Sequence, residues 1–258
     1  MKIPKLSFCI TCKNRFYQIN RTLVQNLTDN RLFKELIEFV LVDFGSTDGL
    51  RDWVLSNFKE ELSEGYLKYY YTEELPFWHA SIAKNTAHLL SNHDILVNLD
   101  CDNYTGYNGG RYIIRQFLKH GEDIIIHQSS DDGLDGSFGR IAVIRDYFFQ
   151  LQGYDESFEP MAYQDTDLIF RLSALNLKYI RIDDEKYNQA IRNSKNEGLE
   201  YTSATINWNE MNRKNSEISR QNLLDGKLRV NSTKWGIRDK IFDAKGNKIV
   251  VINHPRSA

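Results

Sequence analysis

The sequence predicts an α/β fold in which a mostly parallel sheet is flanked by helices and followed by a small C-terminal appendage. Three observations carry this prediction. Short apolar segments of strand length alternate along the chain with segments that have helical spacing. Most of the apolar segments end abruptly in polar or glycine-containing turns. The 258 residues are 41% hydrophobic and 26% charged, which is ordinary for a soluble globular protein.

The individual elements follow from these patterns in chain order. After the first strand, Ile19, Leu23 and Leu27 recur with helical spacing, and the second strand stops at a turn over 44–49 that leads into another helix. Strands are expected over residues 6–11, 37–43, 67–72, 94–100, 124–127 and 140–145. Helices are expected over 17–28, 50–62, 79–91 and 204–224, with one more beginning near 164, and a hairpin is expected over 241–251.

Three of the expected strands end in polar residues, which are Thr11, Asp43 and Asp100. Right-handed crossovers between parallel strands bring the carboxyl ends of the strands to one edge of the sheet. Ligands of open α/β sheets bind beyond that edge. The sequence therefore predicts a polar binding site built from these three ends.

Asp100 closes the expected strand 94–100, and Asp102 follows it with one residue between the two. Alternate residues of a strand point to the same side, so the two carboxylates are expected to project together. Two like charges on one face need a cation or hydrogen-bond donors between them, and a divalent metal that holds a diphosphate is one solution. A solvated turn capped by Asp and Asn is the other interpretation.

Composition and charge restrict the setting. No stretch approaches 18 consecutive apolar residues, and the first five residues lack a signal-peptide core. Three cysteines do not make a disulfide framework, so a reducing, cytoplasmic location is expected. Residues 1–200 carry a net charge of −8 and residues 201–258 carry +6. The basic part is either a solvated tail or a surface for peripheral contact with an anionic membrane, on its inner face, or with an anionic acceptor.

Five motifs in order resemble family 2 glycosyltransferases with the GT-A fold. The motifs read SFCITCKNR, VLVDFGSTDG, SIAKNTA, LDCDN and, further on, GSFGRIAVIRDYFFQLQGYDESF with YQDTDLIFRL. The resemblance covers about residues 5–182. It implies a domain over 1–182, with a nucleotide-binding half over 1–103 and an acceptor half over 104–182. Residues 183–258 then form a lid loop, over the Asn- and Lys-rich part of 188–198, and the helical and hairpin appendage.

The resemblance assigns the nucleotide contacts of a UDP-sugar donor. Asp43 matches the aspartate that accepts from the uracil imide N–H, although this chain has Phe44 where the family usually has a second Asp. Capping of the following turn is the alternative role for Asp43. Lys84 falls where the family has an arginine near the nucleotide, and an exposed helix lysine is its alternative. The loop that would wrap the base and ribose contains Thr11, Lys13, Asn14 and Arg15.

The resemblance also assigns the metal site. Asp102 is the implied ligand of Mn²⁺ or Mg²⁺, and Asp100 contacts the metal or the ribose. Relatives often add a histidine late in the chain, but residues 187–190 contain none. His254 is a candidate ligand if the C-terminal tail folds back, and a residue of a mobile tail otherwise.

The catalytic base of an inverting transfer is expected at the start of a helix. The segment from Gln164 to Leu172 resembles the family pattern there, and Asp165 matches the position of the base. Asp167 is the competing candidate, and capping of the helix N-terminus is the alternative role for both. The glycines of 136–139 are expected to let the backbone approach the donor sugar. Trp78 and His79 either line the sugar pocket or belong to the core.

The resemblance therefore implies a metal-dependent, inverting transfer from a UDP-sugar to a glycan or lipid-linked acceptor. A hexosyl- or N-acetylhexosaminyltransferase of bacterial surface polysaccharide synthesis is expected, with no nucleic-acid partner. A nucleotidyltransferase is one alternative, but the loop 11–15 lacks the glycine usual in that class. A non-catalytic protein that binds a nucleotide sugar or glycan is the other, and the presence of Asp100, Asp102 and Asp165 together argues against it.

Overall fold

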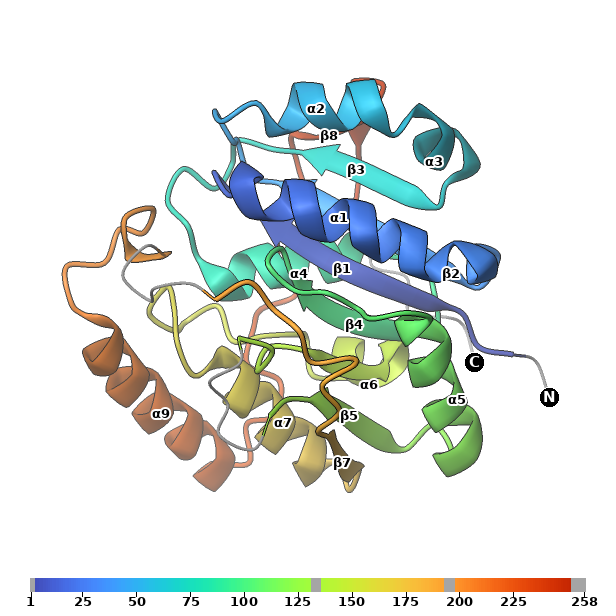
Figure 1. The fold of residues 1–258 in the computed structure, drawn as a ribbon. Helices are drawn as coiled ribbons and strands as arrows, with labels where there is room; N and C mark the ends of the chain where they lie inside the picture. The colour runs from blue at the N-terminus through green and yellow to red at the C-terminus, as the bar shows by residue number, and fades with distance from the viewer. Residues whose placement is uncertain (1–2, 131–135, 193–197, 252–258) are drawn as a thin grey trace.

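A computed structural model describes residues 3–130, 136–192 and 198–251 of the chain. Within these residues the strands form one nine-stranded sheet in the order β7-β5-β6-β4-β1-β2-β3-β8-β9 (Figure 1). The strands are β1 Leu6–Cys12, β2 Ile37–Asp43, β3 Leu67–Tyr71, β4 Ile95–Asp100, β5 Ile124–Gln128, β6 Ile141–Ile144, β7 Lys178–Ile182, β8 Ile241–Asp243 and β9 Lys248–Ile249. The helices are α1 Phe16–Asn30, α2 Leu50–Asn57, α3 Lys59–Glu64, α4 Ala80–Leu90, α5 Gly109–His120, α6 Arg145–Gln150, α7 Gln164–Ala174 and α9 Trp208–Leu224, with a 3₁₀ turn over Arg31–Phe33.

The predicted parallel arrangement holds for the four central strands β3, β2, β1 and β4. Strand β6 runs antiparallel between β4 and β5, and the hairpin β8–β9 adds an antiparallel edge beside β3. The sheet is therefore mixed, and its parallel centre puts the ends of β1, β2 and β4 along one edge. The register sets Thr11 opposite Asp100 and Cys12 opposite Asp43.

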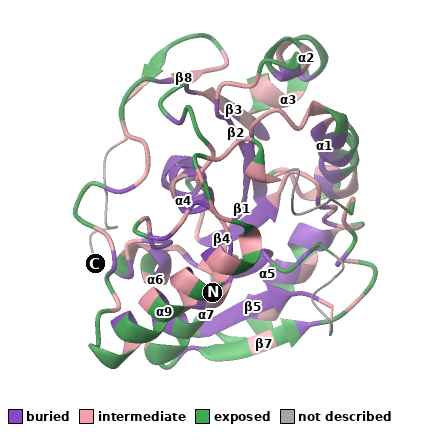
Figure 2. Ribbon diagram, turned by 90° about the vertical axis from the view of Figure 1, so that its left-hand side faces the viewer, coloured by how far each residue is buried: buried purple, intermediate pink, exposed green. Residues whose placement is uncertain are grey.

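Two layers of helices bury the two faces of the sheet. On one face, side chains of α1, α2 and α5 pack on alternate residues of β1 and β2, such as Phe8, Ile10 and Phe39. On the other face, α4 covers Cys9, Val40 and Val42, and α6 with α7 covers the β4–β6–β5 part. Figure 2 shows this burial along β1, β4 and β5, whereas β7 at the edge is largely exposed. Burial on both faces explains why β1, β2 and β4 read as nearly continuous apolar runs.

The C-terminal segment packs against the main sheet and α4. Its hairpin pairs with β3 in the main sheet, and the backbone N–H of Ile237 donates to Oγ1 of Thr86 on α4 at 2.9 Å. The N–H of Gly236 donates to Glu156 at 2.6 Å. The division of the chain at residue 182 stays a prediction. No helix in the described ranges is long and apolar enough to cross a membrane.

Candidate active site

A cavity of about 270 Å³ lies beyond the carboxyl ends of β1 and β4. It brings together side chains from both halves of the chain, since residues of the β1–α1 loop, α4, the end of β4 and the start of α7 all reach it. The lining residues are Thr11, Lys13, Arg15, Gln18, Trp78, Ala80, Lys84, Asp100, Cys101, Asp102, Met161, Gln164, Asp165, Gly198 and Tyr201. Seven of the residues that the sequence predicted for the site are among them.

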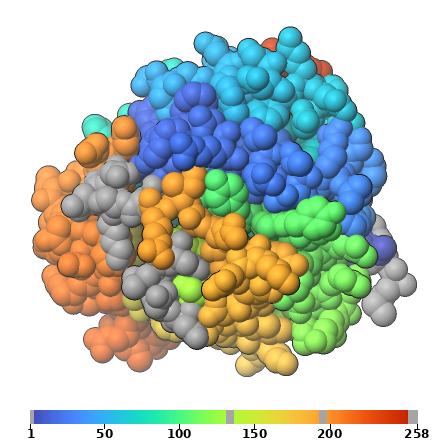
Figure 3. All heavy atoms as spheres, viewed as in Figure 1, coloured from blue at the N-terminus to red at the C-terminus, as the bar shows by residue number. Residues whose placement is uncertain are grey.

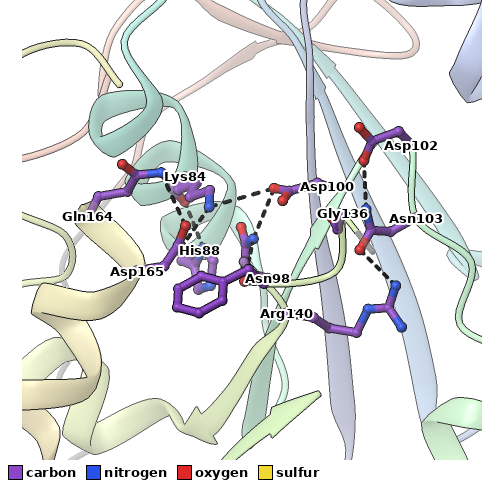
Figure 4. A network of polar contacts seen from close by, with 12 residues as sticks. Lys84, His88, Asn98, Asp100, Asp102, Asn103, Gly136, Arg140, Gln164 and Asp165 are labelled. Carbon is purple, nitrogen blue, oxygen red and sulfur yellow. Dashed lines mark hydrogen bonds and ion pairs between the residues drawn. The ribbon is translucent and has the colours of Figure 1, made fainter. Parts of the chain in front are cut away.

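Asp100 and Asp102 both line the cavity, but they belong to different backbone elements. Asp100 is the last residue of β4, whereas Asp102 lies in the turn that follows, so strand alternation does not fix its direction. Figure 4 shows the Asp100 carboxylate directed toward Lys84 and the Asp102 carboxylate beside Asn103. The amide of Asn103 donates to Asp102 at 2.6 Å. Burial and the charge of Asp100 raise the pKa of Asp102 to about 7.

Lys84 is a buried lysine rather than an exposed one. Its ammonium donates to Oδ1 of Asp165 at 2.7 Å and lies 3.6 Å from Oδ1 of Asp100 (Figure 4). Burial alone would lower the pKa of Lys84, but the two carboxylates raise it above its ordinary value. Lys84 therefore links Asp100 at the end of β4 to Asp165 at the start of α7, in addition to lining the cavity.

The two candidate bases occupy different environments. Asp165 is 8% exposed and lines the cavity, where it also accepts from the amide of Gln164 at 3.1 Å. Burial raises the pKa of Asp165, and the Asp100 charge adds to this while Lys84 opposes it. Asp167 is fully buried, and Nε of Arg171 donates to its Oδ2 at 2.7 Å. Asp167 thus forms an ion pair inside the protein and does not line the cavity.

The remaining predicted nucleotide contacts divide into two groups. Lys13 and Arg15 line the cavity, and the Lys13 ammonium also donates to the carbonyls of Phe44 and Leu75 at 2.6 and 3.1 Å. Asn14 is not among the lining residues. It has a φ of 52° and its Oδ1 accepts from the N–H of Thr47 at 2.8 Å, so it links the two loops that follow β1 and β2.

Asp43 is the predicted uracil contact, and it is fully buried and not among the lining residues. Its two carboxylate oxygens accept from the N–H of Ser46 at 2.8 Å and from the hydroxyl of Tyr69 at 2.7 Å. Burial raises the pKa of Asp43. This geometry is that of a turn cap, and contact of Asp43 with a base stays a prediction. The neighbouring Phe44 packs edge-on against Trp78 of the cavity wall, with ring centroids 5.9 Å apart.

The segment after β7 lies against the turn that contains Asp102. Residues 188–192, predicted as part of a mobile loop, pair with the turn after β4: Asn103 bridges to Ala190, and the N–H of Ile191 donates to the carbonyl of Asp102 at 2.8 Å. Figure 3 shows this orange-coloured segment lying against the blue N-terminal elements. Residues 190 and 191, which adjoin the segment 187–190 that lacks the histidine expected from the resemblance, therefore lie beside the turn that contains Asp102. His254 lies outside the described residues.

Several lining residues were not predicted from the sequence. Gln164 and Met161 lie one and four residues before Asp165, and this closeness in sequence to the predicted base could have identified them as lining residues. Gly198 and Tyr201 come from a stretch without any motif, and the carbonyl of Tyr201 accepts from the N–H of Trp78 at 2.6 Å. The glycines of 136–139 were expected to let the backbone approach the donor sugar. Gly139 has another role in the structure: a Cβ at this position would lie 2.6 Å from Oδ2 of Asp100, so this glycine makes room for the aspartate. His79 bonds to the Phe158 carbonyl and is not a lining residue.

The family model for glycosyl transferase family 2 matches residues 7–171, which is more than half of the chain. The chain belongs to glycosyl transferase family 2. The match spans every cavity element from β1 to the start of α7, and so confirms the family predicted from the motifs. No curated protein sequence matches this chain.

Solved structures of glycosyltransferases confirm the predicted GT-A fold. The mannosyltransferase PcManGT from Pyrobaculum calidifontis, in complex with GDP-Man and Mn²⁺, is 16% identical with a TM-score of 0.56, over 71% of this chain and 56% of that one. S. aureus TarS 1–349 with UDP is 14% identical with a TM-score of 0.59, over 85% and 72%. GalNAc-T7 with UDP, GalNAc and Mn²⁺ is 16% identical with a TM-score of 0.57, over 70% and 43%. The chain thus spans little more than half the length of PcManGT.

The side chains at the end of β4 fit a divalent cation in this family 2 protein. Asp100 and Asp102 both line the cavity and offer hard carboxylate oxygens, which are the ligands that Mn²⁺ and Mg²⁺ prefer. The described residues contain no group of three His, Cys, Asp or Glu side chains arranged around one metal position. A cation held by this pair would take its other ligands from water and from a diphosphate.

Proposed function

We propose that this family 2 protein transfers a sugar from a UDP-sugar to the hydroxyl of a glycan or lipid-linked acceptor, with inversion at the anomeric carbon. The observation that carries the proposal is that Asp165 and the Asp100–Asp102 pair line one cavity, with Lys84 between Asp165 and Asp100. A carboxylate for the acceptor and a carboxylate pair for the donor are the two parts such a transfer requires.

Each group then has a definite task. Asp165 takes the proton of the acceptor hydroxyl as its oxygen attacks the anomeric carbon from the side opposite the leaving diphosphate. The raised pKa of Asp165 suits a base that must accept a proton near neutral pH. Asp102, with Asp100, would hold Mn²⁺ or Mg²⁺. When bound, such a cation offsets the negative charge of the departing nucleoside diphosphate.

The finer parts of the proposal rest on the resemblance. UDP is the proposed nucleotide, and the TarS and GalNAc-T7 complexes support it, whereas PcManGT is a complex with GDP-Man. A hexosyl or N-acetylhexosaminyl group is the proposed transferred group, and a bacterial surface polysaccharide is the proposed class of product. Peripheral contact of the basic residues after 200 with a membrane, and a cytoplasmic location, stay predictions from the sequence.

The test is nucleoside diphosphate release from separate UDP-sugars and GDP-mannose, with Mn²⁺ or with EDTA. The proposal expects Mn²⁺-dependent release of UDP by the wild type, and its loss in Asp102→Asn. Asp239→Asn, at an exposed carboxylate paired with Lys248, is the matched control and should keep the wild-type rate. Formation of a nucleotide sugar from UTP and a sugar 1-phosphate would instead indicate a nucleotidyltransferase. Donor binding without turnover would indicate a binding protein.

A further inference from the structure

Two buried asparagines connect the aspartates of the cavity to the segment 136–140, which leads into β6. Asn98 belongs to β4, and Asn103 lies in the turn that follows β4. Figure 4 shows each side-chain amide beside one of the aspartates. Neither asparagine lines the cavity, so neither is among the residues that a ligand bound there would contact.

Asn98 holds the carboxylate of Asp100. The two residues are separated by one position on β4, so their side chains project to the same side of the strand. Nδ2 of Asn98 donates to Oδ1 of Asp100 at 3.1 Å and to the carbonyl of Gly139 at 2.9 Å. The ammonium of Lys84 approaches the same Oδ1, at 3.6 Å. These contacts hold the carboxylate without using its Oδ2.

Folding stability alone does not account for an asparagine at position 98. Asn98 is 1% exposed, and the other residues of β4 before Asp100 are apolar. The Oδ1 of Asn98 has no hydrogen-bond partner among the residues that the structure describes. A buried polar atom without a partner is destabilising, and a leucine of similar size would avoid that cost. The bond from Asn98 to Asp100 does account for the asparagine.

Asn103 holds Asp102 in a similar way, and the orientation of its amide is fixed from the opposite side. Nδ2 of Asn103 donates to Oδ1 of Asp102 at 2.6 Å and to the carbonyl of Gly136 at 3.1 Å. Nη2 of the buried Arg140 donates to Oδ1 of Asn103 at 2.7 Å. Because a guanidinium can only donate, Asn103 must present its oxygen to Arg140 and its NH₂ group to Asp102. The guanidinium is itself held, since it also donates to the carbonyl of Tyr187.

A neutral amide is a suitable partner for a carboxylate that binds a cation. Hydrogen bonds from residues outside the ligand set orient metal ligands in proteins. An amide fixes the direction of the carboxylate but leaves its negative charge available to the cation. An added lysine or arginine at the same point would offset that charge and compete with the cation.

We propose that Asn98 and Asn103 are positioning residues for the divalent cation, and that they hold the carboxylates of Asp100 and Asp102 in the direction that binds it. Arg140 keeps the amide of Asn103 in its donating orientation. The proposal rests on the proposed function, because it takes the aspartate pair as the cation site.

The test measures the Mn²⁺ affinity of the full chain in the presence of UDP, from the electron paramagnetic resonance signal of free Mn²⁺, with protein-free UDP as the blank. Asn98→Leu and Asn103→Ala should each weaken Mn²⁺ binding by about tenfold to hundredfold, the usual effect of losing a partner of a metal ligand. Asn98→Leu should keep the wild-type urea midpoint, because the Gly139 carbonyl retains the N–H of Ile141 at 3.0 Å. Asn98→Leu then decides the proposal if Asn103→Ala does not fold.

Asn222→Ala is the matched control. Nδ2 of the buried Asn222 donates to Oδ2 of Asp155 at 3.0 Å, so this bond also joins an amide to a buried aspartate, but Asp155 does not line the cavity. The substitution should lower the urea midpoint and leave the Mn²⁺ affinity of the folded protein unchanged. Weaker Mn²⁺ binding with retained stability in Asn98→Leu, and the reverse in Asn222→Ala, is the result expected of a positioning role.

Two results would overturn the assignment. Wild-type Mn²⁺ affinity in Asn98→Leu or in Asn103→Ala would refute the role of that asparagine. An equal loss of affinity in Asn222→Ala would assign the effect to general packing. The wild type separates the two proposals: absence of Mn²⁺ binding with UDP contradicts the proposed function, whereas Mn²⁺ binding that neither asparagine substitution weakens contradicts only the positioning role.

Discussion

The ammonium of Lys84 donates to Oδ1 of Asp165, the proposed base, at 2.7 Å. The same ammonium lies 3.6 Å from Oδ1 of Asp100, so it stands between the base and the aspartate pair. Lys84 is 4% exposed, so this ion pair is nearly dry. Breaking a buried pair is more costly than the pair itself is stabilising, because the remaining charge is left without compensation. The site therefore combines a functional carboxylate with a structural dependence on one lysine.

Lys84→Met should destabilise the protein by about 3 kcal/mol or more, since Asp100 and Asp165 then lack their shared cation. Adding Asp165→Asn should recover part of that loss, because the double variant has one buried charge fewer. Urea unfolding of both single variants and the double variant measures the coupling, with the exposed Lys119→Met as control. If the decreases in free energy of unfolding of the two single variants add up to that of the double variant, this would contradict the ion pair between Lys84 and Asp165.

The aspartates of α7 should separate into a chemical and a structural role. Asp165→Asn should lower sugar transfer by about 10²- to 10⁴-fold while the protein stays folded, the effect of losing a general base. Asp167→Asn should instead lower the free energy of unfolding by about 3 kcal/mol, because it leaves Arg171 buried without a counter-charge. Transfer rates per folded molecule and urea midpoints are the measurements. A near-wild-type rate in Asp165→Asn would refute the base assignment.

Gly139 gives a steric test of the aspartate pair. A Cβ there would lie 2.6 Å from Oδ2 of Asp100 and 3.1 Å from Nζ of Lys84, although the backbone conformation itself accepts alanine. Gly139→Ala should therefore displace Asp100 and weaken UDP and Mn²⁺ binding by about tenfold or more, the loss of one charged contact. Gly109→Ala, which meets only a Thr105 side chain at 3.2 Å and Tyr187, is the control. Calorimetry showing equal affinities for both variants would be inconsistent with this packing.

His88 makes folding stability depend on acid. It is buried on α4, stacks on Phe148 with ring centroids 4.4 Å apart, and its pKa is lowered to about 3 by burial. The unfolded chain takes up a proton below its own pKa of about 6.5 while the folded protein does not. Stability is therefore present above that pH and falls by about 1.4 kcal/mol per pH unit below it, until the folded pKa is reached.

Urea unfolding at pH 7.5 and pH 5 measures this contribution. His88→Gln removes the titrating group, so the pH-dependent loss should be about 2 kcal/mol smaller than in the wild type. The exposed His120→Gln should leave the loss unchanged. Equal losses in His88→Gln and the wild type would show that His88 is not held neutral.

The central strands and the cavity edge were predictable because burial determines their sequence. β1, β2 and β4 are buried on both faces. The predicted limits of β2 match the observed ones, and those of β1 and β4 differ by one residue at one end. β7 was missed because, as an edge strand, it is mostly exposed and carries little apolar pattern. The helix expected over 50–62 is two helices that meet at Phe58, which packs on Trp53.

The site was predictable as a set of positions but not as a set of contacts. The strand ends placed Asp100 at the edge of the sheet, and the family resemblance added Asp102 as a metal ligand and Asp165 as the base at the start of a helix. The sequence could not show that Lys84 bonds to Asp165, 81 residues away, or that Tyr69 occupies an oxygen of Asp43. Such contacts depend on side-chain directions that only packing determines.

The most direct measurement of the central claim is a crystal structure with UDP and Mn²⁺, with anomalous data collected at the manganese edge. The proposed function predicts an anomalous peak at the Asp102 carboxylate, with the diphosphate bound to the same ion and Asp165 facing the cavity. UDP bound elsewhere, or manganese bound away from the Asp100–Asp102 pair, would contradict it.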